Sequence, residues 1–186
     1  MKKLITTFLC IFALSQTANA DTKIAVLDMQ KIMDHSVAYK DIMSQMSKKD
    51  EANKTRASEI QQKLQIDFKA LEKKKPLVKP EEHNKNLREL EDRAQKIHEE
   101  LYMEKISQDN AYAEAAKKLM AKVHEIVAAE ASGRFDLVIV KQYALYAASS
   151  LEITDDILNK LNESIKSIPV EFEKDDKKID SDKSSK

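Results

Sequence analysis

The chain has 186 residues, with 32 basic and 32 acidic side chains, a single glycine and no tryptophan. Charged residues make up 34% of it, which is typical of long exposed helices rather than of a packed globule. The balanced charge argues against bulk attraction to nucleic acid, and one glycine does not build a phosphate-binding loop. We therefore predict no nucleic-acid partner and no use of nucleotide.

Residues 1–20 have the three regions of a secretory signal peptide: a basic start, an apolar run and small residues at the end. The apolar run is too short to span a bilayer, so we expect export and cleavage after Ala20. Cys10, the only cysteine, lies inside this segment. The exported chain is then without a thiol for a disulfide, a metal site or a nucleophile.

Residues 22–27 form a short apolar run with β-branched side chains and predict a strand. Asp28 can cap the helix that follows, because Met29, Ile32 and Met33 fall on one helical face. These residues form the first half of a small body, which we assign to residues 21–35.

Residues 36–130 predict two long helices joined at a tip. They contain no glycine, and their only prolines, Pro76 and Pro80, break the helical pattern near the middle. A short connection favours antiparallel neighbours, so we predict a helical hairpin with its tip at residues 73–80. At 1.5 Å per residue each arm reaches about 60 Å, so most of the hairpin projects into solvent.

Apolar side chains at coiled-coil spacing predict a seam between the two arms. On the outgoing arm they are Ala57, Ile60, Leu64, Phe68 and Leu71. On the return arm they are Leu87, Leu90, Ala94, Ile97 and Leu101, and then Tyr112, Ala115, Leu119, Val123 and Ile126. Residues 46–56 are nearly all polar, so we expect the seam to be thin and mobile there.

Residues 131–168 predict the second half of the body. Gly133 is the expected left-handed residue beyond the return arm. Residues 135–140 predict a second strand, and residues 143–147 a third that pairs with it. Thr154 is expected to cap a helix that ends by Pro169. The charged residues 169–186 predict a disordered tail.

The fold class is therefore α+β, mainly α, with a small β-containing body that is near the lower size limit for an independent core. Both strands are apolar on both faces and need cover on both sides. Self-association through the strands is the simplest remedy, with arms from several subunits leaving one shared body. The residues predicted to form this oligomerisation body are Ile24, Val26, Leu137, Ile139, Leu145 and Tyr146.

Five segments carry a family resemblance when they are taken in order: KIAVLDM at 23–29, RASEIQ at 56–61, DLVIV at 136–140, ALY at 144–146 and ITDDIL at 153–158. In these the chain resembles the Skp/OmpH family of periplasmic chaperones. The resemblance implies a homotrimer whose strands build a shared β-barrel and whose hairpins surround a cavity. It further implies an ATP-independent holdase that binds unfolded outer-membrane β-barrel proteins in the periplasm.

The candidate client-binding residues lie on the outgoing arm and the tip: Met43, Met46, Lys48, Lys49, Lys54, Arg56, Lys63, Lys73, Lys74, Lys75, Leu77, Val78 and Lys79. Each group has a plainer interpretation. The methionines can fill the helix seam, the arm cations can be a solvated face, and the tip can be a solvated turn rather than a contact with client or anionic lipid.

Other functions stay open at this stage. A structural coiled-coil protein could tether or space the layers of a cell envelope, and a secreted adhesin or effector could share the same helices. An enzyme is the least expected class, because the four histidines lack metal-ligand spacing and nothing resembles a nucleophile site. We predict no catalytic residue, no metal and no cofactor.

Overall fold

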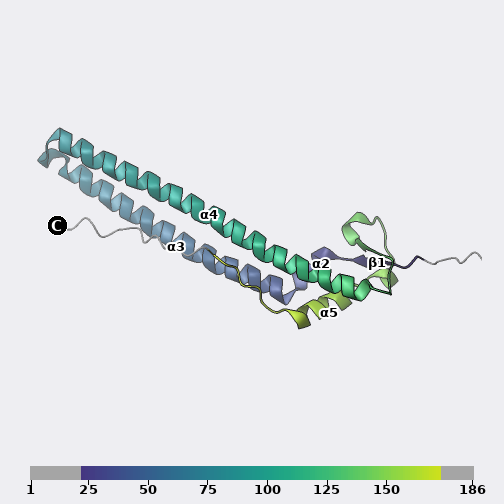
Figure 1. Cartoon of the computed structure of the whole chain (residues 1–186). Helices are drawn as coiled ribbons and strands as arrows, with labels where there is room; N and C mark the ends of the chain where they lie inside the picture. The colour runs from purple at the N-terminus through teal and green to yellow at the C-terminus, as the bar shows by residue number, and fades with distance from the viewer. Residues whose placement is uncertain (1–21, 173–186) are drawn as a thin grey trace, which may run out of the picture.

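The computed structural model describes residues 22–172, and these form a long helical hairpin on a small body (Figure 1). Helix α3 (Val37–Lys74) and helix α4 (Pro80–Ala131) are antiparallel neighbours joined by the 3-10 turn η2 (Lys75–Leu77). The predicted hairpin and its tip are confirmed. The predicted signal peptide and residues 173–186 lie outside the described residues.

The body is built on two strands that bring the ends of the chain together. Strand β1 (Ile24–Leu27) pairs in parallel with strand β2 (Leu137–Val140), with Ile24 beside Leu137 and Leu27 beside Val140. The pairing continues one step before the strands, where the Asp136 N–H donates to the Lys23 carbonyl at 2.8 Å and the Lys23 N–H donates to the Asp136 carboxylate at 2.8 Å. Both strands were predicted, each two residues longer at its start.

The predicted third strand, residues 143–147, is wrong. The chain there leaves β2 through the 3-10 turn η3 (Lys141–Tyr143) and returns through a second one, η4 (Ser149–Leu151). Instead, Glu152 pairs with the other edge of β1, where it forms a single parallel bridge with Val26. Strand preference largely reflects packing against neighbours, and the large side chains of this segment, Tyr143, Leu145 and Tyr146, are left exposed by the described residues.

Two short helices complete the body. Helix α2 (Met29–His35) is capped as predicted, because the Asp28 carboxylate accepts from the Lys31 N–H at 2.9 Å. Helix α5 (Thr154–Ser164) ends earlier than predicted, because the backbone at Ile165 is already extended. Thr154 is not its cap: its hydroxyl is buried and accepts from the Asp28 N–H at 2.9 Å.

The hydrophobic core lies at the root of the hairpin, where α3 and α4 meet α2 and α5 (Figure 1). Its fully buried members include Ile32, Ile42, Leu119, Ile157 and Leu161. Gly133 has a φ of 73°, the left-handed value that turns the chain from α4 toward β2, as predicted. Most of the hairpin extends beyond this core. Among the described residues, no helix is long and apolar enough to cross a membrane.

The seam between the arms follows the predicted residues with one exception. Leu71 and Ile97 are buried, while Phe68 is 47% exposed. Its neighbour Asp67 is half exposed and forms an ion pair with Arg93 of α4 at the edge of the seam. Positions 67 and 68 both lie between Leu64 and Leu71 at helical spacing, so the spacing alone does not decide which of them faces the other arm.

Thr154 offers a direct test of how the two halves of the body are joined. Thr154→Val keeps the side-chain shape but leaves the partly buried Asp28 N–H without an acceptor, so we expect a loss of about 1–3 kcal/mol in the free energy of unfolding. Thr154→Ser keeps the acceptor and is the matched control. Urea denaturation measures both, and equal stability of the two variants would contradict this role.

Candidate binding and assembly surfaces

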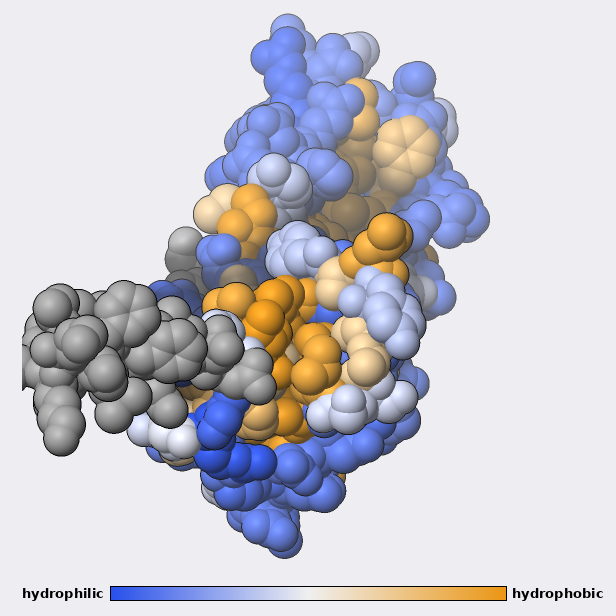
Figure 2. All heavy atoms as spheres, turned by 90° about the vertical axis from the view of Figure 1, so that its right-hand side faces the viewer, coloured by the Kyte–Doolittle hydropathy of each residue, from blue (hydrophilic) through white to orange (hydrophobic). Residues whose placement is uncertain are grey.

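An apolar patch covers the end of the body that faces away from the hairpin tip (Figure 2). Leu145 is fully exposed, and Tyr143 and Tyr146 are nearly so, while Leu137 of β2 is half exposed. Ile24 and Ile139 are partly buried at the strand pair. Among the predicted body residues Val26 alone is buried, which places it in the interior of the subunit rather than on an outer surface.

The loop that presents this patch, residues 141–152, is anchored at its base by three charges. Lys141 forms ion pairs with Glu152 at 2.8 Å and with Asp28 at 3.4 Å. The Lys31 N–H, with help from Lys141, holds the pKa of the Asp28 carboxyl below its usual value, and Glu152 raises the pKa of Lys141. The base of the loop is thus fixed to the strand pair while its apolar side chains face outward.

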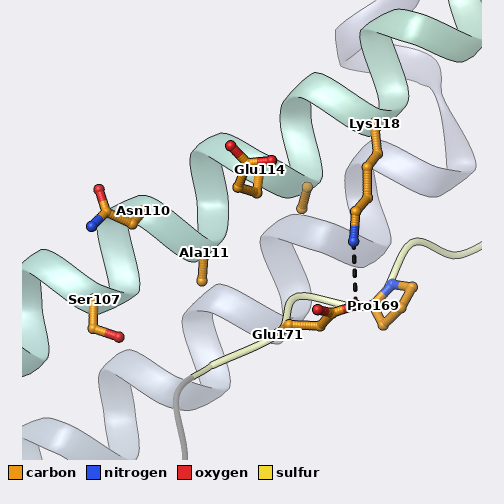
Figure 3. Close-up of a pocket in the computed structure, with 8 residues that line it drawn as sticks. Ser107, Asn110, Ala111, Glu114, Lys118, Pro169 and Glu171 are labelled. Atoms are coloured by element: carbon orange, nitrogen blue, oxygen red, sulfur yellow. Dashed lines mark hydrogen bonds and ion pairs between the residues drawn. The ribbon is translucent and has the colours of Figure 1, made fainter.

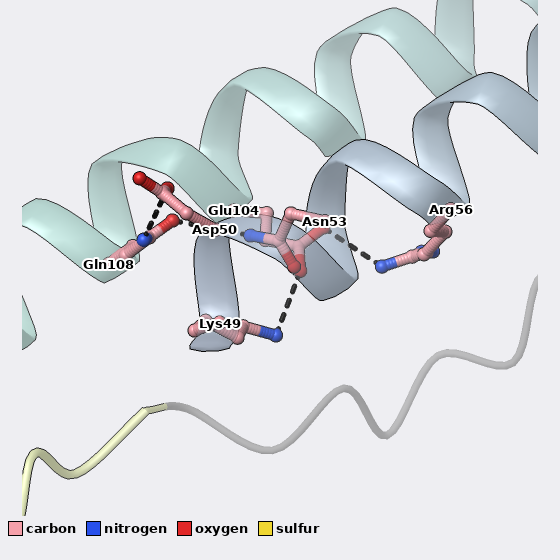
Figure 4. A network of polar contacts seen from close by, with 6 residues as sticks. All are labelled: Lys49, Asp50, Asn53, Arg56, Glu104 and Gln108. Carbon is pink, nitrogen blue, oxygen red and sulfur yellow. Dashed lines mark hydrogen bonds and ion pairs between the residues drawn. The ribbon is translucent and has the colours of Figure 1, made fainter. Parts of the chain in front are cut away.

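A layer of polar side chains crosses the seam near the middle of the arms (Figure 4). Gln108 of α4 is only 2% exposed and donates to the Asp50 carboxylate of α3 at 2.7 Å. The Asn53 amide lies beside Gln108 and Glu104. Glu104 in turn accepts from Lys49 at 2.9 Å and from Arg56 at 2.8 Å. The two arms are therefore joined here by charge-assisted hydrogen bonds rather than by apolar contacts.

This layer changes the interpretation of two predicted client-binding residues. Lys49 and Arg56 both point to Glu104 on the other arm and neutralise its charge, so they hold the hairpin together. We predicted a thin seam at residues 46–56, and this is wrong: the two arms are joined there by polar side chains that contact one another across the seam. The sequence held a signal for this: Gln108 lies seven residues from both Leu101 and Ala115, which is a seam position.

The other predicted client-binding residues do not form one surface. Met43 is exposed near the root of α3, Met46 packs against the core, and the tip lies at the opposite end of that helix (Figure 1). The exposed cations among these predicted residues are Lys48, Lys54, Lys63, Lys73, Lys74, Lys75 and Lys79. At the tip Leu77 is exposed and Val78 is half-buried.

The arms also expose apolar side chains outside the seam: Ile66, Phe68, Tyr102, Met103 and Ile106. Phe68 was predicted for the seam, and Ile66, Tyr102 and Ile106 were not predicted at all, because single apolar residues among charges give no periodic signal. Such isolated side chains offer many small contacts to another chain without creating one large apolar patch. Among the described residues no group of histidine, cysteine, aspartate and glutamate has the geometry to hold a metal ion.

Comparison with known proteins identifies one family and one fold. Residues 23–161 match the model of the family described as outer membrane protein (OmpH-like). A crystal structure of an OmpH-like protein from Caulobacter crescentus CB15, described as a candidate outer membrane chaperone, superposes with a TM-score of 0.77 at 13% identity. The match covers 84% of this chain and 94% of that one. No curated protein matches the sequence.

The polar layer predicts a specific pattern of stability. Gln108→Leu leaves the partly buried Asp50 carboxylate without its donor, so we expect a loss of about 1–3 kcal/mol, whereas Asp50→Leu/Gln108→Leu removes both partners and recovers most of it. Gln95→Leu, at an exposed position of α4, is the control and should be near neutral. Urea denaturation compares the four chains, and a double variant no better than Gln108→Leu would contradict the coupling.

Proposed function

The chain belongs to the OmpH-like family of outer membrane protein chaperones, and we propose that it is an ATP-independent holdase of the periplasm. Its clients are unfolded outer-membrane β-barrel proteins, whose strands carry alternating apolar side chains that cannot yet face lipid. It keeps these chains from aggregating before they are assembled in the outer membrane. Cleavage after Ala20 would release it on the periplasmic side.

The observation that carries the proposal is that the apolar end of the body is uncovered. The long arms that leave the other end of the body bury few side chains. Leu145 and Tyr146 stand free in a single subunit, and large exposed apolar patches mark interaction sites. In our proposal three copies cover these patches in a shared β-structure. Their hairpins then leave the common body side by side and surround a cavity.

Retention of the client needs no tight site in this arrangement. Apolar side chains such as Phe68, Tyr102 and Met103 are spaced along the arms among charged residues. Each contact is weak, but once one arm has bound, the others meet the same client at high effective concentration. Because the arms bind unfolded chains in preference to folded ones, they oppose both early folding and aggregation.

An aggregation assay tests the proposal. A urea-denatured outer-membrane barrel is diluted into buffer without nucleotide, and we expect the chain from residue 21 onward to keep it from scattering light. Leu145→Asp/Tyr146→Asp should need at least about tenfold more chain for the same effect, because single hairpins lose the gain from joint binding. Val37→Asp, at an exposed residue of the first turn of α3, is the control and should act like the unchanged chain.

Two results would contradict the proposal. Aggregation that proceeds unchanged at several-fold molar excess of the chain would exclude a holdase for such clients. Full activity of the folded Leu145→Asp/Tyr146→Asp variant would show that the apolar end of the body plays no part in holding clients.

A further inference from the structure

The segment that follows α5, residues 166–172, lies extended along the root of the hairpin between α3 and α4 (Figure 1). We call it the C-terminal segment. Its side chains alternate: Ile168 and Val170 are 3% and 6% exposed, and Phe172 packs against the same core, while Pro169 and Glu171 face outward. Part of the predicted disordered tail is therefore ordered, because these apolar side chains find a groove.

One side chain of α3 holds the backbone of this segment. The Gln45 amide nitrogen donates to the Ile168 carbonyl at 3.0 Å, and the Gln45 amide oxygen accepts from the Val170 N–H at 2.9 Å. In an extended chain these two groups point to the same side, so the amide occupies the place of a neighbouring strand. Such a contact recognises an extended backbone whatever its side chains are.

Neighbouring residues hold the amide in place and frame the groove. The Asp41 carboxylate accepts from the Gln45 amide at 2.8 Å and from the Ser167 hydroxyl at 2.6 Å. Lys118 of α4 reaches the Glu171 carboxylate at 3.2 Å across the outer edge (Figure 3). A hollow of about 190 Å³ lies between α4 and the outward-facing residues Pro169 and Glu171 (Figure 3).

We propose that this groove is a binding site for an extended peptide with alternating apolar side chains, and that the C-terminal segment occupies it as an internal competitor. The proposal rests on the proposed holdase function, because a strand of an unfolded outer-membrane barrel has this pattern. Client strands displace the segment, take its two backbone hydrogen bonds to Gln45 and fill the pockets of Ile168 and Val170. The segment thereby weakens the hold on short or poorly matched chains.

A labelled peptide of about nine alternating valine and serine residues is a suitable probe, with a peptide of the same composition in blocked order as its control. We expect Ile168→Ser/Val170→Ser to bind it at least about tenfold more tightly than the unchanged chain, because the competitor is removed. Adding Gln45→Leu should abolish the gain. Val37→Ser, an apolar-to-serine change at an exposed residue that belongs to no proposed binding surface, should leave the affinity unchanged. Fluorescence anisotropy measures all four chains.

A second measurement needs no substitution. Amide hydrogen exchange of the unchanged chain should be faster in residues 167–172 once an unfolded barrel is bound, because the Val170 N–H loses its partner when the segment is displaced. Bound barrel with unchanged exchange there would overturn the inference and leave the holdase function standing. So would equal peptide affinity of a folded Ile168→Ser/Val170→Ser variant. Failure to bind the barrel at all would contradict the holdase function itself.

Discussion

The parallel pairing of β1 with β2 is the constraint on which the rest of the structure depends. It places Ile24 beside Leu137, so more than half of the chain must leave the body and come back to the same point. Two long helices joined at a proline-containing tip do this with few loop residues. The same pairing leaves β2 with an uncovered outer side, and the exposed loop beyond it enlarges that apolar surface. The pairing of β1 with β2 thus accounts both for the projecting arms and for the uncovered apolar surface of the body.

The hairpin beyond the core is held by few buried side chains and one polar layer. An all-apolar seam tolerates sliding of one helix along the other, whereas a polar residue at a seam position fixes the register at a cost in stability. Gln108 meets Asp50 in one alignment of the arms only. Arms of this kind keep a defined pairing while burying little surface, and segments with few buried contacts open more easily than the core.

The hairpin could be predicted from the sequence because its signals are local. Pro76, Pro80 and the absence of glycine define two helices, and Asp28 caps α2 through a hydrogen bond three residues away. A polar residue in the seam could also be predicted, because Gln108 falls on the spacing of the seam residues. Its partner Asp50, however, becomes visible only when the two arms are aligned.

The features that could not be predicted depend on residues far away in the sequence. Tyr143, Leu145 and Tyr146 favour a strand, yet the described residues leave these three side chains exposed. From the sequence, Val170 is expected in a charged tail. In the structure it is buried, and its backbone N–H donates to Gln45, which lies 125 positions earlier. Phe68 has seam spacing but is half exposed, and its neighbour Asp67 is paired with Arg93, which lies on the other arm.

The central claim is that a single subunit is incomplete and that copies join through the apolar end of the body. Native mass spectrometry of the chain from residue 21 onward, at micromolar concentration, tests it most directly. Our account predicts one dominant species with the mass of three subunits. A folded species with the mass of one subunit, persisting across that concentration range, would contradict it.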